Sequence, residues 1–529
     1  MVDVTAKNFE DVLPIFEHEL KKCSFIAIDC EFSRLPLDDS SPNFLDSVSE
    51  RYAKIRQNLD KCFPLQVGLV PFTYDRDLVE YKATVYKFNV FPTFFGPFDP
   101  NVTFKSSTVQ FLSKYNFDFN KVFYHGIPFL NVSQRRLVGD MIEKGTFLDK
   151  ISSVLTFDER EAVASQREAI NKWLHHSSAG DCLKIETSPN AAHIKYFLHK
   201  EIRNSFRNVW TYDTDLNSAE IQVKHLADGE RKSVEAQSSD SVEELVTSLS
   251  GFSRVMDALI RSKKPIVGHN LLVDVLSCYH HFYDAAPNDY KTFKNSIGDL
   301  IPTIYDTKFI SHEMKKSAFR DILDNVSLQN LYQTFQNEKY GNKPTICSNS
   351  GSYDKGMLNT AHDAGWDAYM TGFCFVKMIS LQNKLNRNSA DRNTTNAEIM
   401  FAAAAFKNRI NVARAFVPYL RLDGPDPAST RPPYLVVSHV RKSQLNIESL
   451  GKILSDFGTY DVKPLTSYAA TVAAPNYSSY HDVVRRLGKM DEFNVEKYSM
   501  LKHHLLLRSV IAFGFMIPAG LTAWYCWTK

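Results

Sequence analysis

The sequence has almost no excess of one charge, no paired cysteine motif and no secretory signal. Its 62 Lys and Arg residues against 60 Asp and Glu residues leave a net charge of +2, so any surface for nucleic acid must be a local patch. The eight cysteines form no C-x-x-C pair, which argues against a zinc site and indicates free thiols in a reducing compartment. The N-terminus lacks a basic segment followed by a long apolar run, so we expect no secretory signal.

The rest of the composition is that of a folded protein, and the length of 529 residues is enough for more than one domain. An amphipathic helix over 8–22 leads into an apolar strand over 24–28. Strands over 65–70 and 84–90 then precede a helix over 106–115. This order predicts an α/β domain whose sheet begins with a meander.

The same pattern predicts that the α/β domain is interrupted by an insertion. It stops near 154 and resumes near 246, so we expect 1–154 and 246–425 to fold together and 155–245 to form a small inserted helical or α+β domain. The polar, Ser-rich stretch 228–244 predicts a linker. A predicted helix over 193–209 carries a basic stripe, which a solvated surface and RNA contact explain equally well. The stripe consists of Lys195, Lys200, Arg203 and Arg207.

A second, smaller unit is expected after the break at 423–427. Residues 430–495 follow the order strand, helix, strand, strand, helix, which resembles an RNA-recognition (RRM-like) fold. The predicted third strand, 467–473, contains one aromatic residue and lacks the usual stacking pattern. Structural or protein-binding use is therefore favoured over base stacking.

Residues 509–527 form an uncharged, apolar stretch. At about 1.5 Å per residue a helix of this length spans about 28 Å, close to the thickness of a bilayer core. Basic residues precede the stretch and aromatic residues end it: Lys502, His503, His504 and Arg508, then Trp524, Tyr525 and Trp527. A buried core helix is the alternative. We expect a single-pass tail anchor in the mitochondrial outer membrane, with the endoplasmic reticulum as the alternative, and the folded part in the cytosol.

Four acids and one histidine in three separated segments form the candidate site. Asp29 and Glu31 end the first apolar strand and point to the same side, because strand side chains alternate. Two such like charges repel each other unless a cation lies between them. Asp274 follows a strand and turn, and His362 and Asp367 lie five residues apart further along. Together these groups fit a two-metal site for phosphodiester cleavage; the alternative is a coincidental set of surface acids.

The chemistry expected of this site is hydrolysis with two Mg²⁺ ions, or Mn²⁺, because hard oxygen ligands without cysteine disfavour Zn²⁺. Asp29 would bridge both ions and the three other acids would complete their shells. One ion would lower the pKa of a water whose proton neutral His362 accepts. A helix predicted over 360–381, with Thr360 as its N-cap, would carry the last two residues of the site.

Five longer motifs surround or accompany these residues. They are 25–33, 118–128, 251–255, 268–274 and 364–369. They resemble the poly(A)-specific ribonuclease (PARN) family of the DEDDh exonucleases, over roughly 5–425 and more loosely over the RRM-like unit. The resemblance implies an RNase H-like core and 3′-to-5′ exoribonuclease activity on the 3′ end of single-stranded RNA. All five active-site positions of the family are present.

The resemblance also implies roles for residues outside the acids. Phe32 and Lys308 match family positions that contact the RNA 3′ end, by stacking on a base and by contacting phosphate; packing in the core is the alternative for Phe32. The insertion corresponds to a single-strand-binding domain of the R-x-x-x-H type, although 155–245 contains no Arg-x-x-x-His. Related nucleases dimerise, so a homodimer is among the expected assemblies.

With the C-terminal apolar stretch, the chain resembles the membrane-anchored trimmer branch of this family. That branch implies trimming of precursor PIWI-interacting RNAs on the mitochondrial surface in germ cells. It also implies a PIWI-clade Argonaute that holds the substrate and a Tudor-domain scaffold. A poly(A) deadenylase at the same membrane and a noncatalytic RNA-binding tether are the alternatives.

Overall fold

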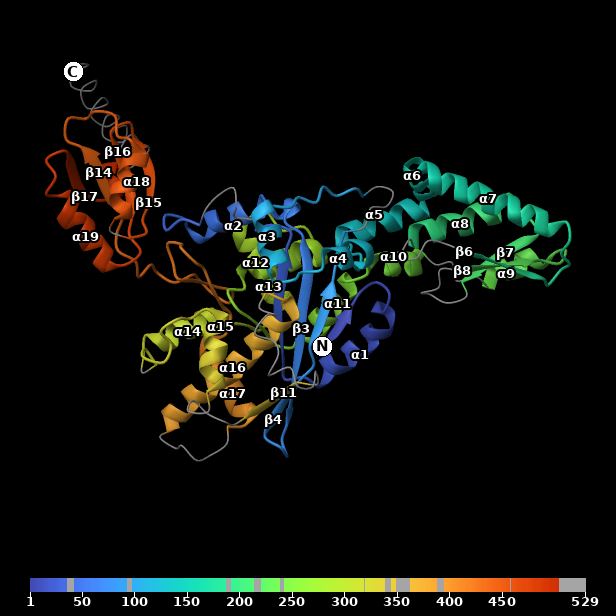
Figure 1. The fold of residues 1–529 in the computed structure, drawn as a ribbon, viewed down its shortest axis with the longest axis horizontal. Helices are drawn as coiled ribbons and strands as arrows, with labels where there is room; N and C mark the ends of the chain where they lie inside the picture. Colours follow the sequence, from blue (N-terminus) through green and yellow to red (C-terminus); the bar gives the residue numbers. More distant parts are fainter. Residues whose placement is uncertain are drawn as a thin grey trace, which may run out of the picture. The chain divides into compact units, whose positions relative to one another are not determined.

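The computed structural model describes most of the chain in two compact units (Figure 1). The described residues are 1–35, 42–92, 98–186, 192–213, 220–237, 242–317, 319–337, 344–348, 362–387, 394–456 and 458–503. The first unit comprises Met1–Ser40, Tyr52–Asn411 and Arg421–Pro425. The second comprises Ser41–Arg51, Val412–Leu420 and Asp426–Lys529.

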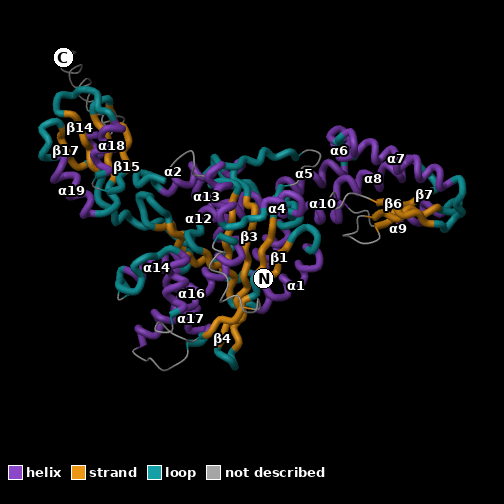
Figure 2. Tube along the Cα trace, viewed as in Figure 1, coloured by secondary structure: helices purple, strands orange, loops and turns teal. Residues whose placement is uncertain are grey.

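The first unit is built on a mixed sheet (Figure 2). Its strand order is β1-β5-β3-β2-β9-β10-β12, and β4 pairs with β3 and β11. The strands are β1 (Val2–Val4), β2 (Phe25–Phe32), β3 (Pro64–Asp75), β4 (Glu80–Ala83), β5 (Tyr86–Asn89), β9 (Ile266–Gly268), β10 (Ile304–Asp306), β11 (Thr345–Ser348) and β12 (Arg409–Asn411). Strand β2 is antiparallel to β3 and parallel to β9. The expected α/β domain with an initial meander is confirmed, with β3 longer than predicted.

Helices pack on both faces of this sheet. On one face α1 (Phe9–Lys22) buries the apolar side of its amphipathic pattern, and Phe16 lies 5.1 Å from the Tyr86 ring of β5. On the other face α16 (Ala364–Arg387) crosses β2, where Phe375 contacts Phe25 at 5.1 Å between ring centroids. Side chains at 25, 27, 29 and 31 of β2 share a face by strand alternation. The two acids of β2 therefore lie on the face that α16 covers.

Further helices of this unit lie outside the stretch from 132 to 250. They are α3 (Ser106–Lys114), α4 (Phe119–His125), α11 (Ser253–Ser262), α12 (Leu272–Cys278), α13 (Tyr290–Leu300), α14 (Thr307–Lys315), α15 (Leu328–Gln336) and α17 (Asn396–Ala403). Helix α2 (Val48–Arg56) and strand β13 (Tyr419–Arg421) straddle the boundaries of the two units in sequence.

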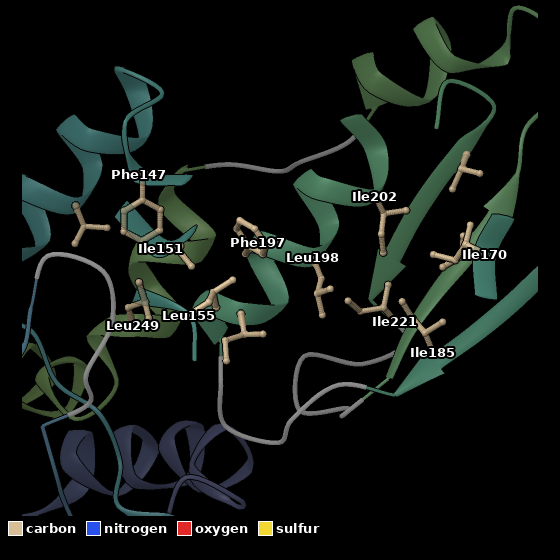
Figure 3. Close-up of a cluster of buried hydrophobic side chains, with 14 of the residues drawn as sticks. Phe147, Ile151, Leu155, Ile170, Ile185, Phe197, Leu198, Ile202, Ile221 and Leu249 are labelled. Carbon is tan, nitrogen blue, oxygen red and sulfur yellow. The ribbon is translucent and has the colours of Figure 1, made fainter. Parts of the chain in front are cut away.

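The segment expected as an insertion shares an apolar core with residues on both sides of it (Figure 3). The elements that follow one another along this stretch are α5 (Val132–Glu143), α6 (Phe147–Val154), α7 (Phe157–Leu174), β6 (Cys182–Glu186), α8 (Ala192–Ser205), β7 (Val209–Asp213), β8 (Glu220–His225), α9 (Glu230–Gln237) and α10 (Val242–Ser250). Of these, α5 and α6 precede residue 155. Phe197, Leu198 and Ile202 of α8 are buried in this core together with Ile221 of β8. Placing the domain boundaries at 155 and 245 stays a prediction.

Two expectations for this segment are corrected. The linker predicted over 228–244 contains α9 and the start of α10, and Val246 and Leu249, three residues apart on α10, pack against the core. The basic stripe is not uniformly solvated, since Arg203 is buried with its guanidinium 4.0 Å from the Trp210 ring centroid. Arg203 therefore stabilises the fold of α8 against β7.

The second unit contains a four-stranded antiparallel sheet with the order β15-β16-β14-β17. In sequence its elements are β14 (Leu435–His439), α18 (Ile447–Ser455), β15 (Asp461–Thr466), β16 (Ala469–Ala473), α19 (Tyr477–Leu487), β17 (Phe493–Lys497) and α20 (Met500–His503). The expected strand–helix–strand–strand–helix order is present, and β17 adds a strand that the pattern had not indicated. The β-α-β-β-α-β arrangement is the split βαβ motif; the RRM-like assignment stays a prediction.

A short segment from early in the chain belongs to this second unit. The Phe44 backbone N–H donates to an Asp461 carboxylate oxygen at 2.6 Å, and the Phe44 ring lies beneath the guanidinium groups of Arg414 and Arg431. Arg51 is 2% exposed; it pairs with Asp46 at 3.1 Å and donates to the Ala413 and Arg414 carbonyl oxygens. Segments 41–51 and 412–420 are thus parts of one buried polar network.

Within the described residues, the helices are all too short or too polar to cross a membrane. The stretch 509–527, where we expect the anchor, lies outside the described residues.

Candidate active site

The site is assembled from the end of β2, the start of α12 and the start of α16. Asp29 and Glu31 project from β2 toward α16, and Asp274 lies in the first turn of α12, buried to 8% exposure. Atoms of Glu31, His362 and Asp367 that could bind a metal all lie within 4.8 Å of one another. The structure therefore brings Glu31 together with His362 and Asp367, and the charges of Asp367, Asp274 and Glu31 act on Asp29.

The local structure around His362 differs from the sequence-based expectation. Helix α16 begins at Ala364, so His362 precedes the helix, in a left-handed backbone conformation with φ of 67°. The predicted N-cap, Thr360, lies outside the described residues. Instead, the Asp363 side chain accepts hydrogen bonds from the backbone N–H groups of Gly365 and Trp366 at 3.1 and 3.2 Å. A turn thus sets the direction of the imidazole, while the helix carries Asp367.

A glycine in β3 allows the start of α16 to come this close to the acids. Gly68 is paired with Asp29 across the β2–β3 ladder. A Cβ atom at this position would lie 1.9 Å from the Ala364 carbonyl oxygen, well inside the contact distance of two atoms. Only glycine therefore permits the first residue of α16 to rest directly on the sheet beside Asp29.

Asp363 and Lys87 are site residues that sequence reasoning missed. Lys87 of β5 pairs with the Asp363 carboxylate at 2.8 Å, and Asp363 contributes to raising the pKa values of Asp29, Glu31 and Asp367. Asp immediately before a helical pattern is an N-cap signal that could have identified Asp363. Nothing local could have identified Lys87, because its role depends on the pairing of β5 with β3.

Two aromatic rings from α3 and its C-terminus flank His362. The Phe111 and Tyr115 ring centroids lie 4.5 and 4.3 Å from the imidazole, each in an edge-on arrangement. Burial lowers the pKa of His362 below its usual value. The imidazole is therefore neutral at pH 7 and able to accept a proton.

The carboxylates destabilise one another electrostatically. Burial raises the pKa of Asp29 well above its usual value, and the charges of Asp367, Asp274 and Glu31 raise it further. The pKa of Glu31 is also raised well above its usual value, by burial and then by the charges of Asp367 and Asp363. Burial raises the pKa values of Asp274 and Asp367 to about 7. A divalent cation would relieve this repulsion, because it places positive charge among the four acids. Carboxylate oxygens are also the ligands that hard divalent cations prefer.

Phe32 lies at the end of β2, which also carries two acids of the site, and Lys308 lies at the start of α14. Phe32 is the last residue of β2 and is 7% exposed. The Lys308 ammonium donates to the Val326 carbonyl oxygen at 2.7 Å, and burial lowers its pKa. Their contacts with RNA stay predictions.

We expect the stability of the protein, stripped of divalent cations with EDTA, to fall as the pH rises from about 4 to about 7 and then to level off. Asp274 and Asp367 have pKa values near 7 in the folded state against a usual value of 3.8, so in this range the folded state binds more protons than the unfolded state. Thermal melting at pH 5.5 and pH 8 measures the difference, which Mg²⁺ should reduce by favouring the ionised carboxylates.

The matched variant Asp274→Asn should flatten this pH dependence, because it removes one of the carboxyl groups whose pKa is raised in the folded state. An EDTA-treated protein that is equally stable at both pH values, or that becomes more stable toward pH 8, would contradict the electrostatic description of the site.

Comparisons with known proteins bear on what such a site does. Residues 4–375 match the model of the CAF1 family ribonucleases. The chain is 32% identical to the pre-piRNA 3′-exonuclease trimmer of Bombyx mori, with 98% of this chain and 97% of that protein covered. It is 27% identical to the poly(A)-specific ribonuclease PNLDC1 of Mus musculus, covering 95% of this chain and 94% of the relative. It is also 27% identical to the poly(A)-specific ribonuclease PARN of Xenopus laevis, with 94% of this chain and 81% of that protein covered.

Proposed function

The chain belongs to the CAF1 family of ribonucleases, and from this premise we propose that it is a 3′-to-5′ exoribonuclease that trims the 3′ ends of PIWI-bound precursor RNAs and releases 5′-nucleotides. The convergence of Glu31, His362 and Asp367 within 4.8 Å supports this proposal most directly. A noncatalytic tether has no use for a buried cluster of mutually repelling acids, whose charges cost stability without a cation.

The residues of the site have distinct roles in this reaction. Asp29, Glu31, Asp274 and Asp367 would hold divalent cations, Mg²⁺ or Mn²⁺, which supply Lewis-acid activation of the scissile phosphodiester. Neutral His362 accepts the proton of the attacking water at a ring nitrogen, and the Phe111 and Tyr115 rings that pack against the imidazole limit its rotation.

The alternative substrate is free poly(A), because two of the relatives are poly(A)-specific ribonucleases. The trimmer of Bombyx mori has the higher identity and nearly equal length, which favours precursor RNA. The partners of the proposed reaction are a PIWI-clade Argonaute that holds the RNA and a Tudor-domain scaffold. A homodimer is a further proposal.

We expect the purified protein to shorten a PIWI-loaded, 3′-extended RNA faster than free poly(A) of equal length. The reason is that the PIWI protein presents the 3′ end and limits the length of RNA that remains accessible. Product ladders from 5′-labelled RNAs measure both rates, with Asp29→Ala protein as the control for contaminating nucleases. Faster shortening of free poly(A) would replace trimming with deadenylation.

We also propose that residues 509–527 anchor the protein in the mitochondrial outer membrane with the nuclease facing the cytosol. The uncharged stretch and the basic residues before it support this placement. A fluorescent fusion of the full chain should coincide with a mitochondrial marker, and one truncated before Ser509 should become diffuse. Organelle staining that persists after truncation, or coincidence with an endoplasmic reticulum marker, would contradict the proposal.

A further inference from the structure

Asp306 is a fully buried carboxylate outside the cluster of acids described above. It is the last residue of β10 and is 0% exposed. As the N-cap of α14 it accepts from the backbone N–H groups of Lys308 at 2.8 Å and Phe309 at 3.4 Å. An ordinary helix cap would need no more than these two bonds.

The same carboxylate also holds two other segments of the chain. It accepts from the backbone N–H groups of Asn270 at 2.9 Å and Leu271 at 3.1 Å, in the turn between β9 and α12. A further N–H group, that of Asn411 in β12, donates to it at 2.9 Å. Five backbone donors from three segments thus converge on one side chain, which is more than capping alone requires.

Neighbouring polar groups reinforce this turn. The Asn411 side-chain amide donates to the Asn270 side-chain oxygen at 2.8 Å, and Asn270 itself has a left-handed backbone with φ of 60°. The Thr307 hydroxyl donates to the Gly268 carbonyl oxygen at 3.0 Å. Gly268 ends β9, and the turn over 269–271 that follows it is fixed by hydrogen bonds to side chains of β10 and β12, while the Thr307 side chain of α14 holds its start.

This turn leads directly to a residue of the active site. Helix α12 begins at Leu272, so Asp274 lies in its first turn. It comes three residues after Leu271, whose backbone N–H donates to Asp306. A shift of the turn would be transmitted to Asp274 through one helical turn. On the other side, the Lys308 backbone is held by the same carboxylate.

We propose that Asp306 is a positioning residue of the nuclease site, which fixes the 268–271 turn so that Asp274 meets Asp29 and Glu31 in a geometry that binds divalent cations. This inference rests on the proposed metal-dependent function. Residues that orient metal ligands through hydrogen bonds commonly affect metal affinity and turnover about 10–100-fold when replaced.

The test is Asp306→Asn in the full chain, with Asp299→Asn as the matched control. Asp306→Asn replaces one carboxylate oxygen with an NH₂ group, which is a donor. Whichever oxygen is replaced, the NH₂ group would face backbone N–H donors from two segments. Asp299 is an exposed acid in α13 that undergoes the same change of charge. Two readouts are needed: the Mg²⁺ concentration that gives half of the thermal shift of EDTA-treated protein, and kcat and KM on a 5′-labelled single-stranded RNA.

We expect Asp306→Asn to raise the Mg²⁺ midpoint and lower kcat by about 10–100-fold, with KM for RNA changed by less than about threefold. High Mg²⁺ should restore part of kcat. Asp299→Asn should match the parent protein in both readouts. A merely structural role would lower the melting temperature in EDTA and leave the Mg²⁺ midpoint unchanged, which would overturn the proposal.

A second variant decides the outcome if Asp306→Asn does not fold. Thr307→Val keeps the side-chain shape and removes the hydroxyl, which donates to the Gly268 carbonyl oxygen at 3.0 Å and lies 2.9 Å from His269 Nδ1 in the same turn. It should therefore raise the Mg²⁺ midpoint in the same direction by a smaller factor. An unchanged midpoint in folded Thr307→Val protein would then overturn the proposal. Parent protein that neither shortens RNA nor responds to Mg²⁺ would instead refute the proposed function.

Discussion

Asp29→Asn is expected to reduce ribonuclease activity by at least about 10³-fold while the protein stays folded. The substitution keeps the shape of the side chain and removes the negative charge at the centre of the acidic cluster, where the other acids act on it most strongly. Because that charge is buried among like charges, its loss should also raise the melting temperature in EDTA at pH 8. Product formation from 5′-labelled RNA in Mg²⁺ and thermal melting in EDTA measure the two effects.

The opposite directions of these effects make the prediction specific. Asp299→Asn, at an exposed position of α13, should change neither activity nor melting temperature appreciably. If Asp29→Asn retained turnover, the assignment of the catalytic site would be wrong. If Asp29→Asn lost activity and also had a lower melting temperature in EDTA, Asp29 would stabilise the fold, and the description of mutually repelling acids would be wrong.

Gly68→Ala is expected to have the second-largest effect, because it displaces the start of α16. The added methyl group would lie 1.9 Å from the Ala364 carbonyl oxygen, which belongs to backbone and cannot rotate away. Overpacking of this kind costs about 1–3 kcal/mol of stability, and here it moves His362 and Asp367 relative to Asp29. We expect activity to fall by at least about 100-fold, as a shift of about 1 Å in a reacting group suffices for that loss.

Gly298→Ala is the matched control, since a Cβ atom at Gly298 in α13 would meet no other atom within 4 Å. Alanine in a helix interior is about 0.5–1 kcal/mol more favourable than glycine, so this variant should be slightly more stable and fully active. Denaturant unfolding and RNA turnover of both variants measure the contrast. A Gly68→Ala protein with parental turnover would show that α16 can shift without disturbing the site.

The parts of the site that follow from strand alternation and local motifs could be predicted from the sequence. The shared direction of Asp29 and Glu31 requires only the period of two in an apolar strand. The left-handed backbone of His362 could not be predicted, because the helix pattern of α16 gives no sign of the conformation two residues before its first residue. Asp363, by contrast, carried an N-cap signal that could have been read from the sequence. The role of Gly68 depends on which strand lies opposite Asp29, and strand pairing over long separations is not encoded locally.

The fold shows the same division between local and long-range information. Helices with a clear apolar side, such as α1, were predicted almost to the residue. Helix α9 and the start of α10 were predicted to be a linker because a polar, Ser-rich composition resembles that of a loop. The apolar residues of α10 that pack into the core, Val246 and Leu249, lie beyond the polar stretch. Strand β17 was missed although Phe493 and Val495 alternate with polar residues, because two apolar positions make a short signal and the pairing with β14 cannot be read from them.

Because segment 41–51 belongs to the second unit, that unit contains residues that are synthesised long before the rest of it. The hydrogen bond from the Phe44 N–H to Asp461 joins residues 417 positions apart. A ribosome working at about 5–20 residues per second needs roughly 20–80 s to make that length of chain. Through this interval the residues that bury Phe44 and Arg51 have not all been made, although β2 and its acids have already left the ribosome. The second unit is therefore completed last, from the newest part of the chain and one of its oldest.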